Sequence, residues 1–222
     1  SDDEDDLRSK LRGLLVTTLA KIGRDRDAQQ RCRDLLAALD ANGATSSGNG
    51  VTADPELISA ATTVVAATGD ATDFERFVAA FEAATTPQES LRNLYALAEF
   101  DDAALIERTC EFAFSGAVRS QNAPYLLGRC IANRHHGARA WTLVRKHWDQ
   151  ANAAFPNPSI IRMVDPVKLL NTPDAVADVQ GFFSEHPIKQ SANTLAQVLE
   201  RQQINAAVRD REAERFTATL AD

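Results

Sequence analysis

PQESLRNLYALAEFDDAALIERTCEFAFSGAVRSQNAPYLLGRCIANRHHGARAWTLVRKHWDQANAAF, residues 87–155, is the stretch that decides the fold. It contains both tryptophans and a succession of helical patterns, which predict helices at residues 88–99, 102–114, 123–134 and 138–155. The last pattern repeats an apolar residue every three or four positions: Trp141, Val144, Trp148, Ala151 and Phe155. Because that spacing gathers side chains on one helix face, we expect this helix to be buried on one side, with both tryptophans in the core.

Helical patterns continue on both sides of this stretch. Near the N-terminus, mostly apolar residues share one helix face for over four turns: Leu7, Leu11, Leu14, Leu15, Thr18, Leu19 and Ile22. The acids Asp2 to Asp6 precede or open this helix, where they suit its positive end. Leu105 and Leu195 lie at the centres of other apolar stripes, and we expect both to be buried.

Three dipeptides predict where helices begin. Each joins a good N-cap residue to a proline at the first helical position: Asp54-Pro55, Thr86-Pro87 and Thr172-Pro173. Glu89 follows Thr86 by three residues and completes a capping box.

No segment alternates apolar and polar residues over the length of a strand, so the sequence predicts an all-α protein. We infer roughly twelve helices joined by short turns, which is typical of an α/α superhelix of irregular HEAT- or armadillo-like antiparallel pairs. The segment NGATSSGNG, residues 42–50, predicts a flexible loop. We expect residues 1–222 to form a single helical-repeat domain.

Charge and cysteine content limit the class of protein. The chain has a net charge of −7, whereas nucleic acids and anionic membranes attract basic surfaces, so neither is an expected partner. Its three cysteines, Cys32, Cys110 and Cys130, predict buried free thiols in a reducing compartment. No apolar run is long enough for a membrane helix, and SDDEDD is unlike a signal peptide, so we expect a cytoplasmic protein. A start at Ser1 without Met suggests a piece of a longer polypeptide.

No arrangement of reactive residues makes an active site in this sequence. None of the four histidines belongs to an HExxH zinc motif, and glycine-rich phosphate loops and G-x-S-x-G elbows are also absent. The pair His135-His136 is interpreted as a polar helix end rather than a metal site, and Asp101-Asp102 as a helix cap rather than an acid/base pair. The loop residues Arg119, Gln121 and Asn122 are expected to cap helix ends or, alternatively, to meet a peptide.

Four segments of the central stretch resemble the C-terminal helical domain of M1-family zinc aminopeptidases. They are LYALAEF (94–100), SGAVRSQN (115–122), IANRHHGARAW (131–141) and VRKHWDQ (144–150). The resemblance extends weakly over most of the chain. It implies a parent enzyme that removes N-terminal residues from peptides with a zinc-bound water, in a catalytic domain that these residues do not include.

The resemblance also implies a substrate-binding role for three residues. In that family the concave side of this domain encloses the active-site cavity and contacts the distal end of the peptide. Relatives that process antigenic peptides carry an aromatic residue at the place of Tyr95 and a basic residue near the place of Glu99. Glu99 reverses this charge, and Lys168, from a later loop region of the same cavity, could replace the missing cation.

The resemblance therefore leads to one main hypothesis and two alternatives. The main hypothesis is a non-catalytic domain whose partners are the catalytic domain of the same polypeptide and peptide substrates, with zinc only in the parent enzyme. A free-standing HEAT-like scaffold that binds another protein is the first alternative. A purely structural module is the second.

Overall fold

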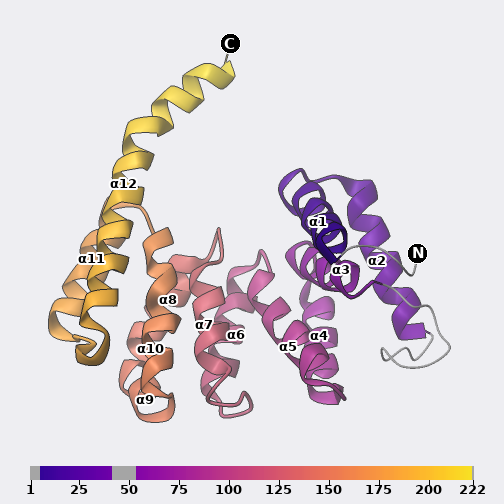
Figure 1. The fold of residues 1–222 in the computed structure, drawn as a ribbon, viewed down its shortest axis with the longest axis horizontal. Coiled ribbons are helices and arrows are strands. Elements are labelled where there is room, and N and C mark those ends of the chain that lie inside the picture. The colour runs from indigo at the N-terminus through magenta and orange to yellow at the C-terminus, as the bar shows by residue number, and fades with distance from the viewer. Residues whose placement is uncertain (1–5, 42–53, 222) are drawn as a thin grey trace. The chain divides into compact units, whose positions relative to one another are not determined.

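The computed structural model describes residues 6–41 and 54–221, and every regular element in these ranges is helical (Figure 1). The described residues form twelve α-helices, one π-helical turn and three 3-10 turns. The predicted all-α class is therefore confirmed. The predicted loop at 42–50 and the acids Asp2 to Asp5 lie outside the described residues.

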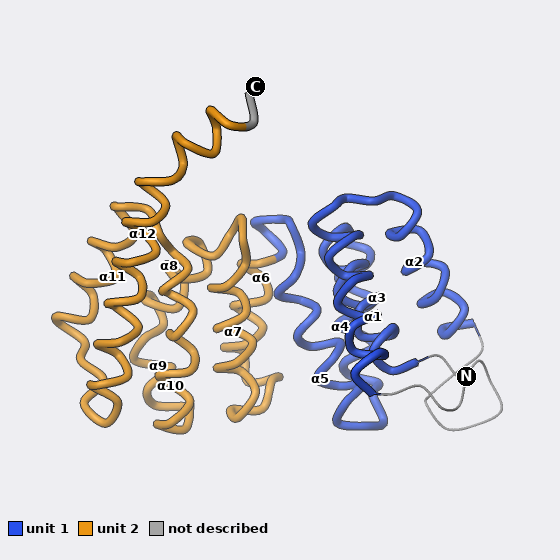
Figure 2. The backbone as a smooth tube through the Cα atoms, turned by 45° about the horizontal axis from the view of Figure 1, so that its top comes forward, with its two compact units in different colours: residues 1–105 blue, residues 106–222 orange. Residues whose placement is uncertain are grey.

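The chain forms two compact units, residues 1–105 and 106–222 (Figure 2). Unit 1 contains α1 (Asp6–Thr17), the π-helical turn η1 (Thr18–Ile22), α2 (Arg26–Ala41), α3 (Pro55–Ala67), α4 (Ala71–Ala83), α5 (Pro87–Ala96) and the 3-10 turn η2 (Leu97–Glu99). Helix α3 is its centre, because α1, α2, α4 and α5 all pack against it. The core of unit 1 includes Val64, Val65, Leu94, Leu97 and Phe100.

Unit 2 begins within α6 (Ala103–Phe114). It continues through α7 (Ala123–Ile131), α8 (Gly137–Lys146), α9 (Trp148–Ala154), α10 (Asn157–Val164), the 3-10 turn η3 (Asp165–Leu169), α11 (Pro173–Glu185), the 3-10 turn η4 (Lys189–Ser191) and α12 (Ala192–Ala221). Edge-on contacts join its two tryptophans to Phe182, with ring centroids 5.2 Å apart in each case. Trp141, Trp148, Leu105 and Leu195 are all buried, as the sequence predicts.

The three predicted helix starts are confirmed. Asp54 accepts a hydrogen bond from the backbone N–H of Glu56 at 2.9 Å and begins α3. Thr86 and Thr172 accept equivalent bonds at 3.3 Å and begin α5 and α11. The carboxylate of Glu89 turns back to the N–H of Thr85 at 3.4 Å, one residue before the partner that a capping box predicts.

Two predicted helices end earlier than their patterns indicate. The helix predicted at 138–155 is divided at His147 into α8 and α9, and the imidazole ring of His147 stacks on Phe114 with centroids 4.9 Å apart. Helix α7 ends at Ile131 rather than residue 134, where the side chain of Asn133 accepts the N–H groups of His135 and His136. In both places side-chain contacts interrupt a continuous helical period.

Helix α1 orients its apolar residues away from the core. It packs on α3 through small residues, and a Cβ atom on the buried Gly13 would lie 3.1 Å from the carbonyl oxygen of Glu56. The aliphatic residues of the predicted stripe are all exposed: Leu7, Leu11, Leu14, Leu15, Leu19 and Ile22. A helical period therefore identifies an apolar face without identifying what covers it.

The cysteines agree with the sequence prediction. Cys32, Cys110 and Cys130 are buried thiols outside any disulfide bond, and burial raises the pKa of the Cys32 thiol. Within residues 6–41 and 54–221, none of the helices combines the length and apolarity that crossing a bilayer requires.

Candidate functional site

Tyr95 lies in the last turn of α5 and is half-buried. The N-terminal end of α5 is capped by Thr86. Leu94 and Ala96, the sequence neighbours of Tyr95, are buried. The backbone at Tyr95 is therefore fixed by the core of unit 1, while the residue keeps partial exposure.

Glu99 is four residues further on, at the end of the turn η2. Its carboxylate oxygen Oε2 accepts a hydrogen bond from the ammonium group of Lys21, which comes from the π-helical turn η1. The side chain of Glu99 is 20% exposed. Glu99 therefore does not present an isolated negative charge, because Lys21 supplies a cation at the same place.

Sequence reasoning missed Lys21. The two partners are 78 residues apart in the chain. No local spacing connects them, and the only signal is that a basic residue follows the apolar face of the first helix. Its position depends on the π-helical turn, a feature often found at functional positions.

Lys168 belongs to unit 2, in the turn η3. Its ammonium group donates to Asp165 Oδ2 at 2.6 Å, and both side chains are partly exposed. The turn is attached to α12 by two amide side chains: Asn205 donates to the carbonyl oxygen of Lys168, and Gln202 to that of Leu170, both at 2.8 Å. Lys168 thus stands on a fixed backbone with its charge paired to a near neighbour.

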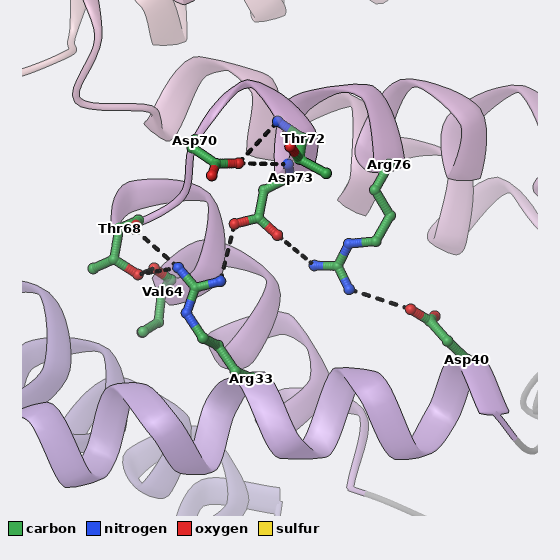
Figure 3. Close-up of polar contacts among 8 residues, drawn as sticks. All are labelled: Arg33, Asp40, Val64, Thr68, Asp70, Thr72, Asp73 and Arg76. Carbon is green, nitrogen blue, oxygen red and sulfur yellow. Dashed lines mark hydrogen bonds and ion pairs between the residues drawn. The ribbon is translucent and has the colours of Figure 1, made fainter.

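A polar cluster fastens α2 to the turn between α3 and α4 (Figure 3). Arg33 donates to Asp73 Oδ2 and to the carbonyl oxygen of Thr68, both at 2.9 Å. Arg76 bridges Asp73 and Asp40 at 3.4 and 3.2 Å. The members pair with one another, which indicates that the cluster holds helices together rather than binding a ligand.

Asp70 caps α4 in the same turn. Its carboxylate accepts hydrogen bonds from the backbone N–H groups of Thr72 at 2.8 Å and Asp73 at 3.2 Å. These two bonds, of which the one from Asp73 has the larger effect, hold the pKa of Asp70 below its ordinary value. Gly69 is needed here, because a Cβ atom would lie 2.6 Å from the carbonyl oxygen of Val65. The turn is therefore specified by its sequence, Thr68-Gly69-Asp70.

The remaining candidate pairs have structural roles. Asp102 accepts the N–H of Leu105 at 2.9 Å and caps α6, as predicted. His135 and His136 lie at the polar start of α8, as predicted. The expected capping by Asn122 is wrong for its side chain, which makes no cap hydrogen bond; the backbone of Arg119 instead accepts the N–H groups of Asn122 and Ala123. In the described part of the chain, no three His, Cys, Asp or Glu residues converge as metal ligands.

Comparison with known sequences decides the family. The family described as "ERAP1-like C-terminal domain" matches residues 1–204. The chain belongs to this family. Its match starts before α1 and ends within α12, so it includes Tyr95, Glu99 and Lys168 as well as Lys21.

The curated relatives are aminopeptidases. Aminopeptidase M1-A of Oryza sativa subsp. japonica is 27% identical over 207 residues, which cover 91% of this chain and 23% of the relative. Aminopeptidase M1-C of the same plant is 25% identical and covers 92% and 23%. The alanine/arginine aminopeptidase of Saccharomyces cerevisiae is 27% identical over 67% of this chain and 18% of its own length. The chain thus spans about a quarter or less of these relatives.

Proposed function

We propose that residues 1–222 are a non-catalytic, single helical-repeat domain at the C-terminal end of an M1 zinc aminopeptidase, where they enclose the active-site cavity and contact the distal part of peptide substrates. The observation that carries the proposal is the combination of a family match over most of the chain with a coverage of only 23% of the plant relatives. The sequence contains no HExxH motif, which leaves the catalytic groups to another part of the polypeptide.

The chemistry divides between the two parts of the enzyme. In the catalytic domain, a zinc ion would lower the pKa of a bound water and polarise the first peptide bond. The residues of this chain would act at a distance. In unit 1, the hydroxyl of Tyr95 and the ammonium group of Lys21 would donate hydrogen bonds to a peptide, and in unit 2 Lys168 offers a cation of its own. Such contacts far from the reacting bond contribute binding energy to turnover of long substrates only.

The ion pair between Lys21 and Glu99 supports this role despite the acidic residue at position 99. A carboxylate alone would repel the C-terminal carboxylate of a peptide, whereas the pair has no net charge. The ammonium group retains donors beyond the one that Glu99 accepts, because it carries three. We place the enzyme in the cytoplasm, which its three thiols outside any disulfide bond support.

The test compares two substrates in the full-length enzyme with and without residues 1–222. We expect the deletion to reduce kcat/KM for a nine-residue peptide more than for an aminoacyl reporter, since only the peptide is long enough to meet Tyr95 and Lys168. A loss of the same size on both substrates would indicate a module that only stabilises the fold. An open reading frame without HExxH upstream would refute the enzyme assignment and favour a free-standing scaffold.

A further inference from the structure

Helix α1 has two faces of opposite character. On one face, Gly13 of α1 and Ala20 of the following turn η1 are buried, and Ser9 donates its hydroxyl hydrogen to Asp54 Oδ1, on the N-cap of α3, at 2.7 Å. Figures 1 and 2 both show α1 running beside α3.

The other face carries the leucine stripe, which we define as Leu11, Leu14, Leu15, Leu19 and Ile22. With 100° of rotation per residue, Leu11, Leu14 and Leu15 of α1 lie within about 100° of the helix circumference, on the side away from Gly13. Leu19 and Ile22 follow in the π-helical turn η1. Each residue of the stripe is 52% to 63% exposed. A surface helix of a finished domain normally shows polar residues on this side, so α1 has the pattern of a helix that is packed on both sides.

The size and surroundings of the stripe limit what can cover it. Five half-exposed aliphatic side chains offer on the order of 300 to 500 Å2, in the range of the largest patches on ordinary monomers. A stable dimer buries about 800 Å2 on each partner, so a second copy of this chain would need much more surface than the stripe offers. One amphipathic helix fits this area. Arg8 and Lys10 are exposed beside the N-terminal end of the stripe, and the exposed Asp6 stands four residues before Lys10 on the same helix.

We propose that the leucine stripe of α1 and η1 is the docking surface for an amphipathic helix that precedes residue 1 in the longer polypeptide. This inference rests on the proposed function, because the family is described as a C-terminal domain and the plant relatives have more than three quarters of their length outside the matched region. The segment before residue 1 is then attached beside α1. Its high effective concentration lets a small apolar surface bind it firmly.

Thiol labelling in the full-length polypeptide tests the proposal. The native cysteines of this chain are buried, so a single exposed thiol can be followed by mass spectrometry of its own peptide. Leu15→Cys, on the stripe, is compared with Phe216→Cys on α12; the native side chains are 58% and 66% exposed. We expect a maleimide to label Leu15→Cys at least about tenfold more slowly than Phe216→Cys in the full-length protein, and at a similar rate in residues 1–222 alone.

The outcomes separate this proposal from the proposed function. Equal labelling of both positions in a full-length protein that contains HExxH would overturn the docking and leave the enzyme assignment standing. Absence of HExxH would refute the enzyme assignment whatever the labelling rates, and a polypeptide with no segment before residue 1 would overturn the docking as well. If protection at Leu15→Cys disappears on dilution, a second copy covers the stripe, and the proposal is wrong.

Discussion

Replacing Trp148 by alanine should remove a large part of the stability of unit 2. Trp148 is 7% exposed, and its ring meets Phe182 at 5.2 Å and Phe183 at 5.8 Å, edge-on in both cases. Truncating a buried tryptophan costs about 3 to 5 kcal/mol through lost burial and the cavity left behind. Each aromatic pair contributes about 0.5 to 1.5 kcal/mol within that total, so we expect a loss near 4 kcal/mol.

Urea unfolding followed by tryptophan fluorescence measures this loss. Both tryptophans lie in unit 2, so Trp141 remains as a reporter of that unit when Trp148 is replaced. Phe216→Ala is the matched control, because it removes an aromatic ring that is 66% exposed on α12 of the same unit. The control should change the free energy of unfolding by less than about 0.5 kcal/mol. A loss that small for Trp148→Ala, with an unchanged m-value, would refute the reasoning.

Two further predictions concern metal binding and pH. Residues 1–222 alone should bind no zinc stoichiometrically and hydrolyse no aminoacyl-anilide, since zinc catalysis needs about three converging protein ligands. Metal analysis measures the bound zinc, and a colorimetric assay measures the hydrolysis. Stoichiometric zinc or hydrolysis in this chain would refute its assignment as a non-catalytic domain. Asp54→Ala should destabilise unit 1 by about 0.5 to 2 kcal/mol at pH 7 through loss of the α3 cap. Hydrogen bonds from the Ser9 hydroxyl, which has the larger effect, and from the Glu56 N–H hold the pKa of Asp54 below its ordinary value. The contribution of the cap to stability is therefore complete above about pH 4 and is lost as pH falls through the lowered pKa. Thermal melts of wild type and variant should therefore converge in acid; a constant difference down to pH 2 would argue against the capping role.

Local chemistry explains which features could be predicted from the sequence. The starts of α3, α5 and α11 depend on a residue and its proline neighbour, and Asp102 needs only a backbone N–H three residues away. The burial of Trp141 and Trp148 follows from spacing within one continuous pattern. These signals lie within a few turns of chain, so a single sequence contains them completely.

The features that were missed depend on contacts between distant segments. The break at His147 accompanies stacking on Phe114, 33 residues earlier, and helical periodicity carries no information about that partner. The apolar face of α1 was found correctly, but the close approach of Gly13 to α3 determines that the opposite face is the buried one. Of the candidate site, Tyr95, Glu99 and Lys168 came from family resemblance, and Lys21 required the fold.

The ion pair between Lys21 and Glu99 couples the two positions. A lysine in place of Glu99 would bring two ammonium groups face to face, and like charges in contact repel each other. A neutral residue at position 21 alone would leave the Glu99 carboxylate without its partner. We therefore expect the effect of a charge at position 99 to depend on the residue at position 21. Exchanging both residues together should change stability by less than the sum of the two single exchanges.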